Sequence, residues 1–458
     1  MSLSKSHLTL LAILGLVPQL YGQGTLTQVL TNGPADQRIN IVFLSEGYLA
    51  TQTNQFAADA RSVLTKILGT APFSAYSSYF NAFNIFVPSV EAGSDHPARG
   101  VFKNTYFNSS YDSYGIARLI TIPPNDRDGN YANGEGKVDG LLQNLMPQYD
   151  LVVLIVNDLE YGGSGGSFSI ASVNASSAEI AIHEMGHTYS GLGDEYDSAF
   201  PGFPDIEEPN TTVQTDRNLL KWHDWVLPGT PVPTPTTSTY GTVVGLFEGA
   251  HYHSSGWYRP KLNCKMRSLG VPFCEVCAEA LVKSTYGLLR PIVANSPGTD
   301  IPVTLLSPET VKLFITCLQP SAYNLKVQWF TNNVAVPGAT NTELTLASSR
   351  LLAGANEVRA EAVDPTPSVR TDPGQVLQDS RTWQVDVQLR PVLDAQYTKN
   401  QIILSWPASF TGFVLESRTN LTATAPWVSR GVAPVLVGDR LTVTNTVTGK
   451  SEYYRLRR

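Results

Sequence analysis

Charge is scarce in this chain of 458 residues. Asp, Glu, Lys and Arg together make up 16% of it, and the formal net charge is −7. A chain this poor in basic residues lacks the positive surface on which nucleic-acid binding depends. Beyond the amino-terminal segment, no run approaches the roughly 20 apolar residues that a membrane-spanning helix requires. The composition therefore argues against nucleic acid as a partner and against a membrane span.

The amino-terminal segment has the pattern of a secretory signal peptide. Lys5 and the amino terminus are weakly positive, residues 8–17 are apolar, and small residues follow around Gly22. An apolar core of about ten residues is too short to span a bilayer. We expect residues 1–22 to be removed and the protein to be secreted, extracellular or periplasmic. An uncleaved anchor is the alternative.

Cysteine is also scarce, with four residues in the whole chain, and the first of them is Cys264. Lipid attachment at the end of the signal peptide is therefore excluded. Export permits disulfides, and we expect Cys264 to pair with Cys274 or Cys277, since Cys317 lies farther along the chain. The alternative is a zinc ion bound by the first three cysteines, which would need a fourth ligand.

The most informative segment is His183-Glu184-Met185-Gly186-His187, an HExxH motif. Ser176-Ser177-Ala178-Glu179 before it is typical of a capping box, and Gly191 after it is typical of a helix end. Residues four apart on a helix lie on one face, so both imidazoles can reach one metal at roughly 2.0–2.1 Å. Glu184, beside the first ligand, is the expected general base of a zinc hydrolase.

The third zinc ligand is expected just after this helix. In metzincin peptidases a glycine turn and then a His or Asp follow HExxH, and this chain keeps that Gly-x-x-Asp spacing at Gly191 and Asp194, with one extra residue before the glycine. We predict Asp194 as the third ligand, with Glu195 as the reserve. Met266 then occupies the place of a Met-turn, whose methionine forms an apolar floor below the metal.

Over about residues 25–292 the chain resembles the bacterial IgA-peptidase family of secreted, metzincin-like zinc metallopeptidases. The resemblance rests on segments that occur in one order, namely Asn32-Gly33-Pro34, 38–44, 161–166, 176–179, 183–196, 256–260 and 263–267. It implies a zinc-dependent endopeptidase and does not imply that this chain cleaves immunoglobulin. Because some metzincins use a tyrosine from the region before the Met-turn to stabilise the oxyanion, we favour Tyr258 over Tyr252, His253 and Arg259 for that role.

The predicted fold class is an α/β metzincin-like peptidase domain over residues 24–292, with a mixed sheet and an active-site helix. Residues 150–156 are continuously apolar, as expected for a central strand. The glycine-rich stretch 162–166 and residues 168–172 suggest a turn and an edge strand beside the substrate, or alternatively a flexible hairpin. After a linker, alternating strands indicate an immunoglobulin-like β-sandwich over 301–390 and a fibronectin-like β module over 391–458.

The sequence thus predicts a secreted zinc endopeptidase that acts on proteins or peptides, with Zn²⁺ bound by His183, His187 and Asp194. We expect a monomer whose C-terminal β modules act as spacers or contact a surface or glycan. The alternative is a secreted binding or adhesion protein with a structural or inactive zinc site, and an aminopeptidase or amidase is a weaker option. Glu184 favours the enzyme, because a purely structural site needs no unliganded glutamate beside its first histidine.

Overall fold

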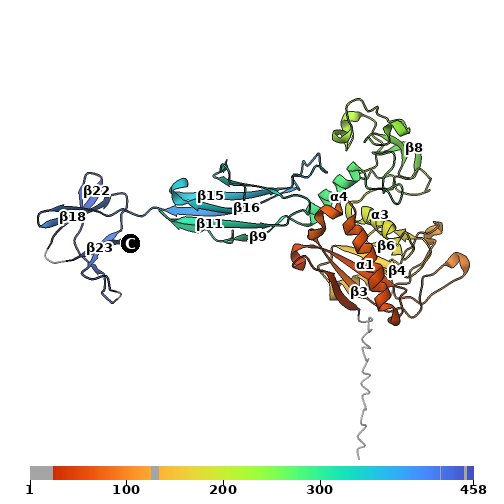
Figure 1. Ribbon diagram of the computed structural model, residues 1–458, viewed down its shortest axis with the longest axis horizontal. Helices are drawn as coiled ribbons and strands as arrows, with labels where there is room; N and C mark the ends of the chain where they lie inside the picture. The colour runs from red at the N-terminus through yellow and green to blue at the C-terminus, as the bar shows by residue number, and fades with distance from the viewer. Residues whose placement is uncertain (1–23, 125–133, 423, 448–450) are drawn as a thin grey trace, which may run out of the picture. The chain divides into compact units, whose positions relative to one another are not determined.

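The structure, a computed structural model, describes residues 24–124, 134–422, 424–447 and 451–458 (Figure 1). The predicted signal peptide, residues 1–22, lies outside the described residues. The chain divides into two compact units. The first contains the chain up to Ala294 together with Thr316–Val327 and Glu361–Ser380, and the second contains Asn295–Ile315, Gln328–Ala360 and Arg381–Arg458.

A six-stranded mixed sheet organises the first unit. Its strands are β1 (Thr25–Leu30), β2 (Ile39–Glu46), β3 (Phe80–Phe86), β4 (Leu151–Val156), β5 (Gly163–Ser164) and β6 (Ser169–Ser172). Their order across the sheet is β1-β3-β2-β4-β6-β5. The four inner strands are parallel, whereas β1 and β5 run antiparallel to their neighbours and form the two edges.

Helices cover both faces of this sheet. They are α1 (Thr53–Gly69), α2 (Glu135–Leu145), α3 (Ser177–Ser190) and α4 (Glu275–Leu288). Successive side chains of a strand point to opposite faces, so Ile41 and Phe43 of β2 pack in one core with α1, α3 and α4, while Val42 and Leu44 pack in another with α2. In Figure 1, α1 and α3 lie side by side over the strands. Helix α3 is thereby fixed against the sheet next to its β6–β5 edge.

Shorter elements complete the first unit. The hairpin of β7 (Phe247–Ala250) and β8 (His253–Arg259) precedes α4. The described 3₁₀ helices of this unit are Ala35–Gln37, Ala50–Gln52, Phe73–Tyr79, Pro97–Arg99, Ser113–Gly115, Arg217–Leu219, His223–Trp225 and Ser238–Tyr240, and Ser348–Arg350 lies in the second unit. No described helix is long and apolar enough to cross a membrane.

The remaining strands form four antiparallel or mixed sheets. They are β9 (Ile292–Ser296), β10 (Val303–Leu306), β11 (Thr310–Cys317), β12 (Lys326–Thr331), β13 (Val334–Ala335), β14 (Glu343–Ala347), β15 (Gly354–Val363), β16 (Gln378–Gln388), β17 (Asp394–Thr398), β18 (Gln401–Pro407), β19 (Val414–Arg418), β20 (Val428–Ser429), β21 (Val435–Val437), β22 (Arg440–Thr446) and β23 (Tyr453–Arg457). The sheet orders are β10-β16-β15-β12-β13, β14-β11-β9, β17-β18-β22-β21 and β20-β19-β23.

Buried tryptophans mark the cores of the second unit. Trp329 and Trp383 stack with their ring centroids 5.4 Å apart, and Trp406 is buried with Leu404, Leu415 and their neighbours. Alternating burial along β15 and β18 matches the predicted half-buried strands. The assignment of these parts as immunoglobulin-like and fibronectin-like modules stays a prediction.

Candidate metal centre

Helix α3 presents the two histidines of the HExxH motif. Its residues 180–182 are buried in the core between the helix and the sheet, which fixes the rotation of α3 about its own axis. His183 and His187 follow on one face, and their ring nitrogens Nε2 lie 3.3 Å apart. Gly191 ends the helix with φ of 60°, as predicted, because this left-handed conformation costs glycine little. The turn brings the next residues back toward the histidines.

Asp194 completes a triangle of ligand atoms. Its Oδ1 lies 3.1 Å from His183 Nε2 and 3.4 Å from His187 Nε2. Metal–ligand distances of roughly 2.0–2.1 Å in a tetrahedral site place the ligand atoms about 3.3–3.4 Å from one another, close to the observed spacing. Beyond these two ring nitrogens, the buried Asp194 Oδ1 has no hydrogen-bonding partner in the described part of the chain. The three predicted ligands therefore fit one metal ion.

Backbone carbonyls hold both imidazoles in the orientation that a metal requires. His183 Nδ1 lies 3.0 Å from the carbonyl oxygen of Lys265, and His187 Nδ1 lies 2.6 Å from that of Leu192. Each Nδ1 must carry the proton in order to donate to a carbonyl, which leaves the Nε2 lone pair directed at the centre of the triangle. Lys265 and Leu192 thus support the ligands without touching the metal position.

The charges around the triangle favour a cation. Burial opposes protonation of His183 and His187, but the Asp194 carboxylate outweighs it, raising the pKa of His183 and bringing the pKa of His187 to about 10. Burial opposes ionisation of Asp194 in turn, yet the two imidazoles hold the pKa of its carboxyl well below the usual range. A proton balances the carboxylate when no metal does, so metal and protons compete for this site.

Glu184 lies beside the triangle without joining it. Its Oε2 is 4.0 Å from His187 Nε2, and the side chain is 13% exposed. Burial raises the pKa of its carboxyl, while His183 and His187 act in the opposite direction. Glu184 is therefore a buried carboxylate close to the candidate metal position that is not itself one of the three ligand groups.

Glu195, the predicted reserve ligand, faces elsewhere. Its carboxylate lies among Cys264, Cys274 and Cys277, and this group is separate from the histidine triangle. All four cysteines of the chain are described, and none forms a disulfide, so the predicted bond from Cys264 to Cys274 or Cys277 is not present. The two neighbouring acids therefore serve two different clusters.

The triangle opens into a cavity of about 1010 Å³. Its lining includes 115–119, the glycine-rich stretch 163–166, the three ligands and Glu184. We predicted 168–172 as the edge strand, but β6 is an inner strand and β5 is the edge. The reason is the antiparallel turn between them, which places Gly163 opposite Ala171 and carries the glycines outward over α3.

Close packing explains the glycines of this edge. A Cβ on Gly165 would lie 2.9 Å from His187 Cβ and 3.1 Å from Glu184 Oε2, and one on Gly163 would lie 2.5 Å from Ile180. Only backbone fits between the cavity and the helix here. On its other side Gly163 pairs with Leu119. This part of the cavity wall is therefore main chain, close to the candidate metal position.

The structure does not place Tyr258 at the cavity. Its backbone pairs with Thr212 and with Glu248, and its side chain is not part of the cavity lining. The tyrosines beside the triangle are Tyr196 and Tyr252. The Tyr196 hydroxyl lies 3.5 Å from His183 Nε2, and the Tyr252 hydroxyl donates a hydrogen bond to Asp194 Oδ2.

Sequence reasoning missed Tyr196, although it lies two residues after the third ligand. The signal was available in that spacing, because a chain that returns to the metal at Asp194 also keeps its next residues nearby. The ring of Tyr196 stacks on His183, with centroids 5.9 Å apart and the planes 24° from parallel. Burial raises the pKa of this phenol, and the Asp194 and Glu184 charges raise it further, so it remains a proton donor.

A family comparison decides the class of the protein. The model of the IgA peptidase M64 family matches residues 27–240 and 236–285, more than half of the chain. The chain belongs to the IgA peptidase M64 family. The resemblance found in the sequence is thus confirmed, and this M64 member is a peptidase with a candidate metal site at the centre of the matched region.

Other comparisons add little to the M64 assignment. No curated protein matches the chain. Among solved structures, chimeric titin Z1Z2 functionalized with a KLER exogenous peptide from decorin is 12% identical, with a TM-score of 0.16, and covers 34% of this chain and 89% of its own. The titin domains z1z2 in complex with telethonin give 11% identity, a TM-score of 0.15 and the same two shares. At such TM-scores the likeness supports no conclusion about fold.

Met266 of the M64 chain lies against α3, the helix of the candidate metal site. It is fully buried, and a Cβ built on Gly186 would lie 2.6 Å from its sulfur. Gly186 immediately precedes His187, so the methionine fills the space behind the histidines, where the Met-turn interpretation placed an apolar floor. The absence of a side chain at residue 186 is what lets α3 approach this loop.

We expect Gly186→Ala to destabilise the protein by about 1–3 kcal/mol, because the added methyl group overpacks the buried Met266. The matched control is Gly287→Ala in α4, where a Cβ meets nothing within 4 Å. That change should be neutral or stabilising by about 0.5–1 kcal/mol, as usual for glycine in an exposed helical position. Thermal unfolding of both variants measures the difference. Equal shifts would contradict the packing argument.

Glu179 does not form the predicted capping box with Ser176. The Ser176 side chain makes no capping hydrogen bond. The Glu179 carboxylate binds Lys66 of α1, Lys265 and the backbone N–H of Gly270. Burial opposes ionisation, but these partners outweigh it and lower the pKa of Glu179 to about 2. This one carboxylate therefore joins α3 to α1 and to the loop that carries Met266.

Glu179→Gln should lower the free energy of unfolding at pH 7 by about 1–3 kcal/mol. A folded-state pKa below the usual value of a glutamate means that the ionised form favours folding. That contribution is present above about pH 4.5 and is lost as the pH falls toward 2. Urea unfolding at pH 7 and pH 3 should show the gap between wild type and variant narrowing at pH 3. Glu248→Gln, at an exposed residue of β7, is the control for removing one carboxylate.

Proposed function

We propose that this peptidase is a secreted zinc-dependent endopeptidase that hydrolyses peptide bonds of extracellular proteins. The observation that carries the proposal is the ligand triangle of His183, His187 and Asp194, whose 3.1–3.4 Å spacing suits a tetrahedral metal with one position left for water. Two imidazoles and one carboxylate suit zinc among the available divalent metals. Bound there, zinc would act as a Lewis acid and lower the pKa of water toward about 7.

The residues of the chain supply the rest of the reaction. Glu184 accepts the proton of the attacking water and returns it to the leaving amine. Its burial and its 4.0 Å separation from His187 Nε2 keep it near the metal position without making it a ligand. The Tyr196 hydroxyl donates a hydrogen bond to the oxyanion that forms on the substrate carbonyl. Tyr252 holds Asp194 in place and acts as a positioning residue.

The cavity supports an extended peptide as the substrate. Its wall at Gly165 and Gly166 is backbone of the turn between β5 and β6, and main-chain groups there suit hydrogen bonds to an extended substrate. Such contacts do not depend on a free peptide terminus, and this favours an endopeptidase over an aminopeptidase. Secretion rests on the signal-peptide pattern of residues 1–22, and the C-terminal β modules serve as spacers or as surface-binding units.

The test is digestion of a denatured protein mixture with the purified protein, with the new peptide ends identified by mass spectrometry. We expect internal cleavages that stop when 1,10-phenanthroline removes the metal and resume on addition of Zn²⁺. Release of single terminal residues would indicate an exopeptidase. A protein that keeps its metal and cleaves nothing would favour the alternative of a binding protein with an inactive site.

A further inference from the structure

A second group of metal-ligating side chains lies behind the first. It consists of Glu195, Cys264, Cys274 and Cys277, whose ligand atoms all lie within 4.8 Å of one another. All four side chains are buried, and none is more than 5% exposed. They come from the segment after α3, from the Met266 loop and from the start of α4. Three separate parts of the chain therefore converge on one point.

The spacing of these atoms matches a tetrahedral metal rather than a disulfide. Cys264 Sγ lies 3.6 Å from Cys277 Sγ, and Cys277 Sγ lies 3.6 Å from Glu195 Oε1. Zinc–sulfur bonds of about 2.3 Å and zinc–oxygen bonds of about 2.0–2.2 Å give tetrahedral S–S and S–O separations of about 3.8 and 3.5 Å. A disulfide would need its sulfurs about 2.05 Å apart.

We propose that Glu195, Cys264, Cys274 and Cys277 bind a second zinc ion, which is structural. Four protein ligands close the coordination sphere and leave no position for water, as in structural zinc sites. The buried Glu195 Oε2 has no hydrogen-bonding partner among the described residues, which is the state expected of a carboxylate placed for a cation. Thiolate ligands favour zinc over hard cations such as Mg²⁺ or Ca²⁺.

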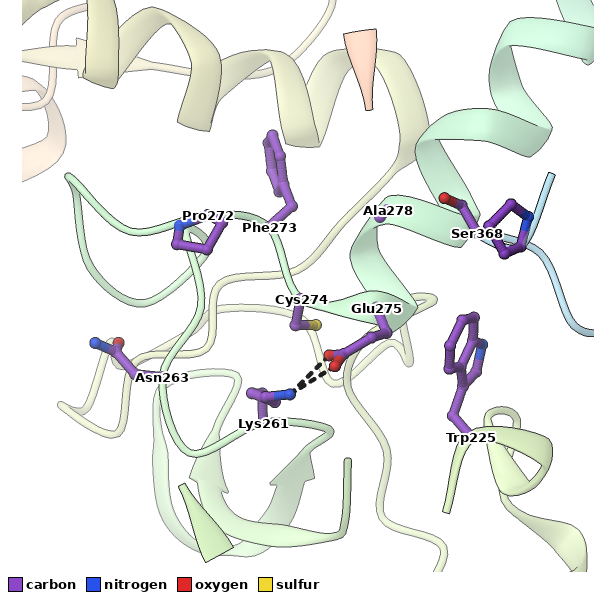
Figure 2. Close-up of a pocket in the computed structure, with 10 residues that line it drawn as sticks. Trp225, Lys261, Asn263, Pro272, Phe273, Cys274, Glu275, Ala278 and Ser368 are labelled. Carbon is purple, nitrogen blue, oxygen red and sulfur yellow. Dashed lines mark hydrogen bonds and ion pairs between the residues drawn. The ribbon is translucent and has the colours of Figure 1, made fainter. Parts of the chain in front are cut away.

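A helix terminus and a backbone donor are directed at these sulfurs. Cys274 precedes the first turn of α4 and Cys277 lies within it, so the amino-terminal end of the helix dipole faces both sulfurs. The backbone N–H of Cys274 donates to Cys264 Sγ over 3.2 Å. Figure 2 shows Cys274 at the start of α4, next to Glu275 and its ion pair with Lys261. A hydrogen bond and an ion pair therefore fix the start of α4 beside the sulfurs.

The second site would fix the geometry of the first. Glu195 directly follows the ligand Asp194, and its backbone N–H donates to the carbonyl of Met266 over 2.9 Å. Cys264 directly precedes Lys265, whose carbonyl lies 3.0 Å from His183 Nδ1. A metal that joins Glu195 to Cys264 therefore ties together the third ligand of the catalytic triangle and the support of its first histidine.

The second site can be tested by a spectroscopic signal that does not depend on enzymatic activity. Because sulfur ligands occur only in the second group, Co²⁺ bound there should give a sulfur-to-cobalt charge-transfer band, whereas Co²⁺ in the histidine triangle should not. We expect about two metal ions per chain in the wild-type protein and about one in His187→Ala, which keeps the band. Cys277→Ser should lose the band, while the control Cys317→Ser, outside the group, should retain it.

Three results would overturn the second site. They are a wild-type protein that shows no thiolate band, one whose mass reveals a disulfide among Cys264, Cys274 and Cys277, and a band that survives Cys277→Ser. If Cys277→Ser does not fold, the band in wild type and in His187→Ala still decides the question. The measurement is independent of the proposed peptidase mechanism, since an inactive protein with the band retains the second site and an active one without it does not.

Discussion

Glu184→Gln should lower kcat/KM for peptide hydrolysis by about 10²–10⁴-fold, the usual contribution of a general base. The substitution preserves the size of the side chain and removes its ability to accept a proton. Glu184 is not among the ligand atoms of the triangle, and its Oε2 lies 4.0 Å from His187 Nε2. The variant should therefore keep its metal and its fold while losing most of its activity.

The informative comparison measures metal content and cleavage on the same samples. Glu248→Gln, an exposed glutamate of β7, is the control and should match the wild type in both. A Glu184→Gln protein that cleaves at a rate close to that of the wild type would rule out this residue as the base. A variant that loses its metal would show instead that Glu184 supports the site structurally.

Local patterns made much of the metal centre predictable. The positions of His183 and His187 on one helix face, the glycine stop at Gly191 and the return of the chain toward the histidines all follow from rules that operate over a few residues. The central strand at β4 was equally readable, since its residues are continuously apolar and all buried. These features depend on the neighbouring residues and little on the rest of the fold.

Features that depend on distant segments were not predictable in the same way. Asp194 and Glu195 are chemically similar neighbours, and successive side chains of non-helical backbone tend to point in opposite directions. Which acid meets the histidines depends on where Cys264 and Cys277 lie, some 70 to 80 residues later. Glu179 likewise has the spacing of a capping box, but the lysines of two other segments compete for its carboxylate.

The choice of Tyr258 for the oxyanion contact rested on its closeness in sequence to Met266, and closeness in sequence does not fix the position in the fold. Tyr258 lies nearer than Tyr252 to the Met266 loop in the sequence, yet β8 carries it away from the cavity and its backbone pairs with Thr212. Tyr196 remains beside His183 because the chain has only just left the metal position at Asp194. On these positions we propose Tyr196 in place of Tyr258 as the oxyanion contact.

Tyr196→Phe should lower kcat by about 10²–10³-fold, as expected when one donor to an oxyanion is removed. KM and metal content should change little, because the phenol contacts charge that develops only during the reaction. Tyr252→Phe should behave differently. It removes the hydrogen bond to Asp194 Oδ2, so we expect about 10–100-fold weaker metal binding, with activity largely restored by excess Zn²⁺.

Tyr258→Phe is the matched control, because it removes the same hydroxyl from a residue outside the cavity lining. Steady-state kinetics at saturating Zn²⁺ separates the three tyrosines, since only the loss caused by Tyr196→Phe should persist there. An impaired Tyr258→Phe beside an active Tyr196→Phe would return the oxyanion role to Tyr258. It would also mean that β8 approaches the substrate during the reaction. A lasting defect in Tyr196→Phe alone would place the oxyanion on the side of the metal position that faces Tyr196.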